Sequence, residues 1–259
     1  MPTPESILPH LFGLALVISR LTGLFIFAPL LSSVMVPRQM KVMIAFGTAL
    51  AIYPALDHAT MIPARLDLIT LAPLMASELL IGLSIGILAA IPLMTAQLAG
   101  LIMGQQMGLG LAAVYNPTID FEGDNLGQIL FFVALASYLV AGGLDMVFGT
   151  LLATFSRVPI GGVALSDAPL ELLVGVVHSG FDAALRISMP VVLILTLETI
   201  ASGLIMKSVP ALNIMSVGFP LRVLLGLLMV VASLAITFEV LMGTIEDDIM
   251  LIGAWVEGL

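Results

Sequence analysis

Six charged side chains fall inside long apolar runs of this sequence, and they are its most conspicuous candidates for chemistry. A charge at the centre of a membrane helix costs about 2.5–3.5 kcal/mol on insertion scales, so each should find a partner or water. Arg20 paired with one of the three glutamates is the obvious solution, although the sequence does not select which one. The six residues are Arg20, Glu78, Asp145, Arg186, Glu198 and Glu239.

Two interpretations of these charges are open. They could form an ion or proton relay. Alternatively they could clamp helices or subunits together, or lie in spans that do not face lipid. We favour clamps, because the acidic residues do not cluster in one element as a relay would need. Asp182 and Arg186 are four residues apart with the acid first, which is the favourable order for an ion pair on a helix.

No catalytic or metal-binding pattern accompanies the charges. The chain has no cysteine, and its three histidines lie in different segments without the spacing of metal ligands. We find no HExxH, P-loop, GxSxG or paired-carboxylate signature. We therefore expect no enzyme, no metal and no cofactor.

The composition is that of an integral membrane protein. Hydrophobic residues make up 60% of the chain and charged residues 10%, whereas a soluble domain carries about 25% charged residues. The mean hydropathy is +1.20. A net charge of −9 argues against nucleic acid as a partner and against a polybasic surface for anionic lipid.

The apolar runs predict an all-α polytopic membrane protein of about six long, partly kinked helices arranged as helical hairpins. Residues 68–103 would extend about 54 Å as a helix, which exceeds the ~30 Å hydrocarbon core. Pro73 and Pro92 therefore predict a kink or break there, and Pro190 predicts the same in the overlong fifth run. The six predicted spans are residues 7–31, 40–56, 68–103, 126–155, 170–206 and 219–243.

Lysine and arginine in the short connections predict the orientation. Arg38 and Lys41 follow the first span, and Lys207 and Arg222 lie between the fifth and sixth. In a six-crossing arrangement these pairs share one side, which the positive-inside rule makes the cytoplasm. Both ends of the chain would then lie outside.

The longest polar, glycine-rich interruption runs from Leu98 to Asn125. Gly104, Gly108 and Gly110 fall close together, and each glycine weakens a helix by about 1 kcal/mol relative to alanine. Irregular backbone at membrane depth needs protein or a water-filled cavity to satisfy its polar groups. We expect the segment to line or close a cavity, although an ordinary flexible loop fits the same pattern.

Several passages together resemble one family, the FliR/SctT proteins of flagellar and injectisome type III export gates. The likeness covers nearly the full chain, in matching order and spacing. One departure is Ala211 after Pro210, where many relatives have glutamine. The passages are RLTGLF from Arg20, AP at Ala28, VP at Val36, ELLIG from Glu78, AG at Ala99, QMG from Gln106, NP at Asn116, MP at Met189 and VPALNIMSVGFP from Val209.

The resemblance implies a non-enzymatic subunit. One copy would join several P-type and Q-type subunits in a helical pore that admits unfolded export substrates. Residues 1–180 would be the P-like part and residues 181–259 a Q-like helical hairpin. The implied further partners are the B-type switch protein and the A-type export component, in the bacterial inner membrane at the flagellar basal body.

The resemblance also assigns a role to the glycine-rich segment. In this family the loop after the QMG motif projects into the channel as a plug, and the flexible thioethers beside it could form a deformable seal. The plug residues carried over are Met103, Gly104, Gln105, Gln106, Met107, Gly108, Leu109, Gly110, Leu111, Tyr115 and Asn116.

The width of a channel for a polypeptide indicates an assembly of several subunits. A translocating polypeptide, even as a helix, needs about 10–12 Å of bore, which six spans of one chain can hardly enclose. The alternative function is a secondary transporter for a small solute, suggested by broken helices and carboxylates within spans. The choice between a flagellar and an injectisome system stays open, with the N-terminal motif favouring the flagellar one.

Overall fold

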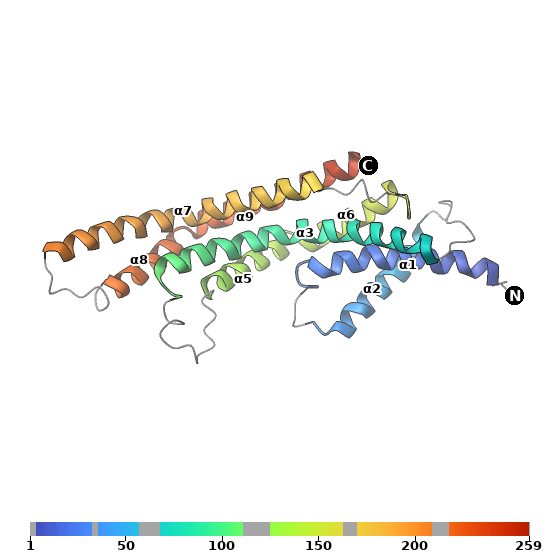
Figure 1. Ribbon diagram of the computed structural model, residues 1–259, viewed down its shortest axis with the longest axis horizontal. Coiled ribbons are helices and arrows are strands. Elements are labelled where there is room, and N and C mark those ends of the chain that lie inside the picture. The colour runs from blue at the N-terminus through green and yellow to red at the C-terminus, as the bar shows by residue number, and fades with distance from the viewer. Residues whose placement is uncertain are drawn as a thin grey trace. The chain divides into compact units, whose positions relative to one another are not determined.

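The computed structural model describes residues 4–32, 36–56, 68–110, 125–162, 170–208 and 218–258, and within these ranges it contains helices and no strand (Figure 1). The predicted all-α class is therefore confirmed. The elements are α1 (Pro4–Phe27), α2 (Arg38–Ile52), the 3-10 turn η1 (Tyr53–Ala55), α3 (Leu68–Met107), α5 (Asn125–Val140), α6 (Gly143–Arg157), α7 (Leu170–Ser208), α8 (Phe219–Ala232) and α9 (Leu234–Gly258).

The contacts of the chain divide it into two compact units. The first comprises Met1–Ile91, Gly142–Val176 and Glu246–Leu259, and the second comprises Pro92–Ala141 and Val177–Ile245. Each unit takes residues from both sides of position 180. The expected division into a P-like and a Q-like part concerns likeness to other subunits, and it stays a prediction.

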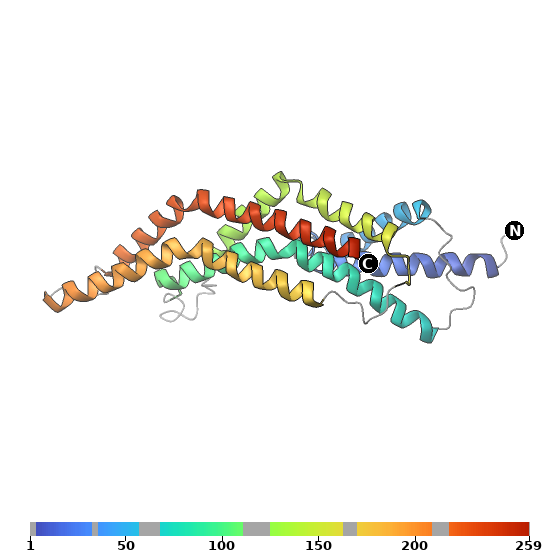
Figure 2. The same cartoon turned by 90° about the horizontal axis from the view of Figure 1, so that it is seen from above.

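The two longest helices are continuous, so of the kink or break predicted at their prolines the break does not occur. Helix α3 has 40 residues and passes through Pro73 and Pro92, while α7 has 39 residues and passes through Pro190 (Figure 2). A proline removes only one backbone hydrogen bond of a helix, and the bonds on either side of it persist here. Each helix is close to 60 Å long at 1.5 Å per residue, about twice the thickness of the hydrocarbon core.

Fewer helices can cross a membrane than the six expected. In the described part of the chain, three helices are long and apolar enough, namely α1, α3 and α7. Two further pairs, α5 with α6 and α8 with the first part of α9, would each count as one bent span, for up to five. Helix α2 has only 15 residues, or about 22 Å, and is too short for the crossing predicted at 40–56.

In the first unit, α1 and α3 cross so closely that only glycine fits. A Cβ atom on Gly82 would overlap the backbone carbonyl of Arg20, and one on Gly23 would overlap the backbone of α3. A Cβ on Gly86 would lie 2.7 Å from the carbonyl oxygen of Leu24. Small residues let membrane helices approach backbone to backbone, and these three glycines bring the two helices together.

Apolar side chains at helical spacing surround this crossing. On α1 the buried positions recur every three or four residues, as expected for one face of a helix. On α3 the buried positions extend the same contact. The fully buried leucines and isoleucines of this core are Leu16, Leu21, Leu24, Ile85 and Leu88.

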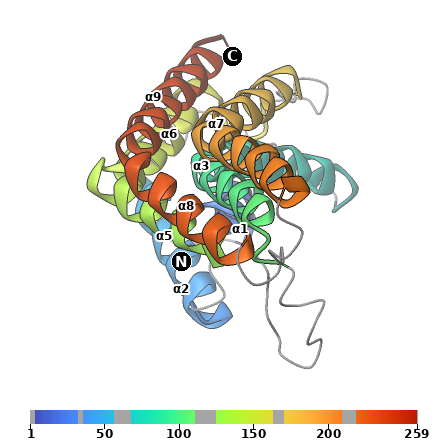
Figure 3. The same cartoon turned by 90° about the vertical axis from the view of Figure 1, so that its left-hand side faces the viewer.

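The second unit packs around the last part of α3. A Cβ on Gly100 would lie 2.7 Å from the backbone nitrogen of Gly127 at the start of α5. The Thr95 hydroxyl donates to the carbonyl of Gly180 on α7 at 3.2 Å. The final turns of α3 also lie beside α8, as the end-on view shows (Figure 3). Close helix contacts through small residues thus recur in both units.

We predict that Gly82→Ala destabilises the protein by about 3 kcal/mol, because the added methyl group must push the backbones of α1 and α3 apart. Gly47→Ala in α2 is the matched control, since among the described residues no atom lies within 4 Å of its Cβ position. That change should be neutral or stabilise by up to about 1 kcal/mol. Thermal unfolding of the purified chain in detergent measures both. Equal melting temperatures for the two variants would contradict the close crossing.

Candidate functional site

The centre of the first unit is a buried ion pair between α1 and α3. Arg20 and Glu78 have side chains that are 0% and 1% exposed, and the Arg20 Nε–H donates to Glu78 Oε2 at 2.5 Å. The structure therefore confirms that Arg20 pairs with a glutamate, and it selects Glu78 from the three candidates.

The remaining donors of Arg20 reach α6 and the residue that follows it. Its Nη1–H donates to the Thr154 hydroxyl at 3.2 Å, and its Nη2–H donates to the Val158 carbonyl at 3.4 Å. The guanidinium carbon lies 4.3 Å from the centre of the Phe155 ring, which is a cation–π contact. One side chain of α1 thereby holds both α3 and the end of α6.

The carboxylate of Glu78 is engaged on both oxygens. While Oε2 accepts from Arg20, Oε1 accepts from the backbone N–H of Gly161 at 2.8 Å. Gly161 has a φ of 76°, a left-handed conformation that favours glycine in this turn. A carboxylate occupied in this way is a structural clamp, which agrees with our preference for clamps over a relay.

The local sequence explains how these atoms meet. Arg20 precedes Gly23 by three residues, and Glu78 precedes Gly82 by four, so each charge lies about one helical turn before a crossing glycine. The close backbone approach at the glycines therefore brings the two charged groups together. The RLTG and ELLIG passages are the two halves of one contact.

Four of the six predicted charges are not buried within the chain, so contacts of these four with other subunits stay a prediction. Asp145 and Glu239 are exposed, and Glu198 is half-buried and accepts a hydrogen bond from Ser202 at 2.5 Å. Arg186 forms the predicted pair with Asp182 at 2.7 Å, but both side chains are exposed. The apolar runs around these charges form helix faces that the chain itself leaves uncovered.

Sequence reasoning missed one buried acid, Asp248. It follows Glu246 and Asp247 on α9 and is only 3% exposed. Neither of its carboxylate oxygens has a hydrogen-bond partner among the described residues. Helical periodicity could have found it, since Leu241, Ile245 and Asp248 recur at intervals of four and three along one buried face.

The glycine-rich segment begins as helix. Helix α3 continues through Gly104 and ends at Met107, where Gly108 has a φ of 80°. The Gly108 N–H donates to Gln105 O at 3.0 Å and the Leu109 N–H donates to Gly104 O at 3.1 Å, which is the pattern of a Schellman motif. Gly108 therefore terminates the helix.

The predicted plug residues divide into three groups. Met103 and Met107 are 1% and 0% exposed, and a Cβ on Gly226 of α8 would lie 2.6 Å from Met107 Cγ, so these thioethers pack inside the second unit. Gly104 is buried beside them. Gln105 is exposed, whereas Gln106, Gly108, Leu109 and Gly110 are half-buried. The remaining plug residues, Leu111, Tyr115 and Asn116, lie outside the described residues.

The helices and the buried ion pair together define the class of this protein. The chain is a helical membrane protein whose one buried ion pair in the described part holds helices together. The family described as "Bacterial export proteins, family 1" matches residues 11–247, and the chain belongs to this family.

Characterised relatives agree with the family. The chain is 29% identical over 213 residues to the flagellar biosynthetic protein FliR of Escherichia coli (strain K12), covering 82% of this chain and 80% of the relative. It is 26% identical over 230 residues to FliR of Bacillus subtilis (strain 168), covering 87% of each. It is also 26% identical over 161 residues to the secretion system apparatus protein SsaT of Salmonella typhimurium, covering 62% of each.

The family and its relatives establish the broad function. The protein is a membrane component of a bacterial protein-export apparatus, of the kind found in flagellar biosynthesis and type III secretion. Members of the family are structural components of that apparatus and not enzymes. The resemblance to the FliR/SctT proteins is thus confirmed.

We predict that Glu78→Gln destabilises the chain by about 3–5 kcal/mol, because it leaves the charge of Arg20 buried without a counter-ion. Combining Arg20→Met with Glu78→Leu should recover much of this loss, since apolar side chains need no partner. Unfolding of the detergent-purified variants measures both effects. The control is Asp182→Asn, which breaks the exposed pair and should cost less than about 1 kcal/mol. A double variant less stable than Glu78→Gln would contradict the clamp.

Proposed function

We propose that this chain forms one sector of a hetero-oligomeric pore in the type III export gate, most simply that of a flagellum. The pore passes unfolded export substrates, and the glycine-rich segment closes it at rest. The observation that carries this proposal is the surface of α7.

Helix α7 is apolar, and much of it is left uncovered by its own chain. An 18-residue apolar window within Leu172–Ser208 is only 11% buried, whereas the corresponding window within Thr70–Met107 of α3 is 72% buried. The whole span from Leu172 to Ser208 extends about 55 Å, and lipid can cover only ~30 Å of it. The remaining apolar surface therefore needs protein neighbours.

Two further features of α7 favour protein neighbours over lipid. The exposed pair of Asp182 and Arg186 lies within the apolar surface, where lipid would solvate it poorly. Gly175 and Gly203 have no described atom within 4 Å of their Cβ positions. Glycines in helices allow the backbone of another helix to approach closely, and here the chain itself supplies no such helix.

The neighbours that fit are other subunits of the same apparatus. We propose P-type and Q-type subunits as direct partners, with residues 1–180 acting as the P-like part and residues 181–259 as the Q-like hairpin. The B-type switch protein and the A-type export component are the next contacts. The complex lies in the bacterial inner membrane at the flagellar basal body.

The end of α3 supports the closing role. Gly108 fixes the point where the helix stops, and Met103 and Met107 anchor its last turns by packing in the second unit. A loop that starts from an anchored, capped helix can be held in a fixed place in a channel. The proposed plug begins in these last turns of α3, at Met103, and ends at Asn116.

The alternative, a small-solute transporter, would need carboxylates free to bind and release a cation. Glu78 is held by Arg20 and Gly161, and Asp145 lies exposed in the first turn of α6. Neither position offers a binding site enclosed by the chain. The exposed apolar surface of α7 therefore favours an export subunit over a small-solute transporter.

Composition of the purified complex tests the assembly. We predict that co-expression with P-type and Q-type genes of the same genome yields a hetero-oligomer containing one copy of this chain, measured by native mass spectrometry. Replacing Leu193 and Leu197 on the exposed face of α7 by Gln should reduce partner retention at least tenfold. A stable monomer or homo-oligomer that retains no partner would favour the transporter.

We predict that deleting residues 110–114 leaves the complex assembled but makes the cell membrane leak ions, because Gly108 and Leu109 still cap α3 while the plug is lost. Conductance across planar bilayers, or ion-dependent growth, measures the leak. The control is deletion of residues 61–65, between η1 and α3, which should not raise the conductance. Background conductance in an assembled complex without residues 110–114 would overturn the plug.

A further inference from the structure

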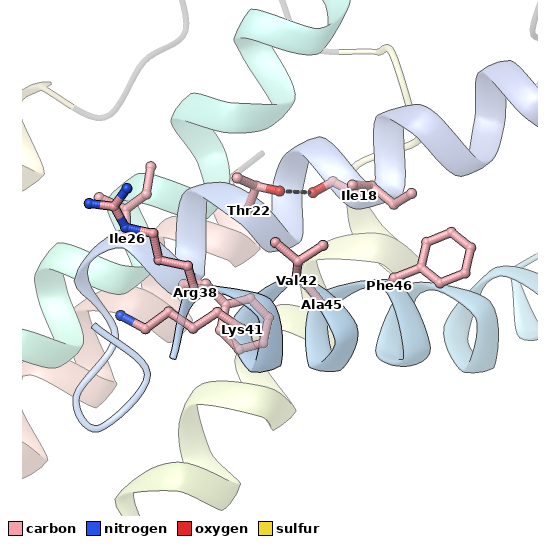
Figure 4. A pocket seen from close by; sticks show the side chains of 9 residues that line it. Ile18, Thr22, Ile26, Arg38, Lys41, Val42, Ala45 and Phe46 are labelled. Atoms are coloured by element: carbon pink, nitrogen blue, oxygen red, sulfur yellow. Dashed lines mark hydrogen bonds between the residues drawn. The ribbon is translucent and has the colours of Figure 1, made fainter. Parts of the chain in front are cut away.

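A cavity of about 500 Å³ lies between α1 and α2 in the first unit (Figure 4). Its walls are almost wholly apolar, formed by Ile18, Phe25 and Ile26 of α1 and by Val42, Ala45 and Phe46 of α2. None of the residues that form the clamp around Arg20 and Glu78 lines this cavity.

The polar groups of the cavity are few and distinct. The Thr22 hydroxyl donates to the Ile18 carbonyl within its own helix at 2.7 Å, so its hydrogen is already used. The other two are the cations Arg38 and Lys41, and no acidic residue lines the cavity. Figure 4 shows both cations at the Ile26 end and Phe46 at the other.

The position of the cations matches a membrane interface. The candidate span of α1 ends at Phe27, one residue beyond Ile26, and the cavity follows the last turns of that span. A ligand whose charged group lies beside Arg38 would therefore place that group at the membrane surface and its apolar part along the hydrocarbon core. Such a division between charge and apolar length is that of a phospholipid.

The cations are free to bind an anion. The Lys41 ammonium donates to the Ser32 carbonyl at 3.1 Å, which holds it in place and leaves two of its three N–H donors. Arg38 is exposed and makes no hydrogen bond or ion pair with the described residues. A guanidinium binds the oxygens of a phosphate in a fork, and a neighbouring ammonium adds charge.

We propose that the cavity between α1 and α2 binds one anionic phospholipid, with its phosphate at Arg38 and Lys41 and an acyl chain between Ile18 and Phe46. The site is built from two cations and an apolar groove, so it differs from the polybasic surface that the net charge argues against. Anionic lipids gather in the cytoplasmic leaflet, and Arg38 and Lys41 follow the candidate span of α1, at an end that the positive-inside rule predicts to be cytoplasmic. This proposal does not depend on the pore or its plug.

A peptide is the poorer occupant. An extended segment would bring backbone N–H and C=O groups, and the apolar walls offer them no partners. An acyl chain brings no polar group. The cations at one end and the absence of hydrogen-bonding walls therefore favour lipid.

The test measures lipid retention by the delipidated full chain in detergent. Native mass spectrometry follows a titration with phosphatidylglycerol and, separately, with phosphatidylethanolamine of the same acyl chains. We expect one phosphatidylglycerol to bind at least tenfold more tightly than phosphatidylethanolamine. The double change Arg38→Gln and Lys41→Gln should weaken its binding about thirtyfold, or about fivefold for each cation. Lys207→Gln, at the exposed end of α7, is the matched control and should change nothing.

A second variant separates the groove from the charges. Val42→Trp fills the cavity from an exposed position while keeping both cations, and it should also abolish tight retention. A photoreactive phenylalanine analogue in place of Phe46 then reports the occupant in the assembled complex. Crosslinks to lipid support the proposal, and crosslinks to a protein subunit overturn it in favour of a partner helix. Unchanged retention in the double variant or in Val42→Trp would also overturn it.

Discussion

The arrangement of the first unit depends on two opposite charges held away from water. Removing ionised groups from water costs several kcal/mol each, and only close pairing with additional hydrogen bonds offsets the cost. Arg20 and Glu78 meet both requirements. Thr154 and Val158 accept further hydrogen bonds from the Arg20 guanidinium, which also lies against the Phe155 ring. The backbone N–H of Gly161 donates to the second carboxylate oxygen of Glu78. The penalty for a mispaired charge also selects one register of α1 against α3, since a shifted helix would leave both groups buried alone.

Glycine makes that register accessible. Gly23 and Gly82 remove the side chains that would keep the backbones of α1 and α3 apart, and the charged groups about one turn away then come within bonding distance. In the second unit Gly100 likewise brings the backbone of α5 against α3, while Gly226 of α8 leaves room for the side chain of Met107. Lipid supplies no hydrophobic force between helices, so close packing and polar contacts hold such a protein together.

The surfaces that remain uncovered are as informative as the cores. Helix α7 is long, apolar and largely unburied, while α3 is enclosed by its own chain. Asp145, Arg186 and Glu239 lie on these uncovered surfaces, so their side chains are exposed, whereas the side chain of Arg20 is buried. In a subunit of a larger assembly, polar and apolar side chains that are exposed in the single chain are those that contact neighbouring subunits.

The sequence by itself determined the helical membrane class, the export family and the pairing of Asp182 with Arg186, because composition, motif order and helical spacing are local properties. The tertiary structure decided which glutamate pairs with Arg20, since 58 residues separate the partners and only the helix crossing brings them together. It also showed that α3 and α7 continue through their prolines, and that Met107 packs beside Gly226. The spacing of Asp248 from Leu241 and Ile245 was a local signal for its burial, but only the tertiary structure shows that this face of α9 is the covered one.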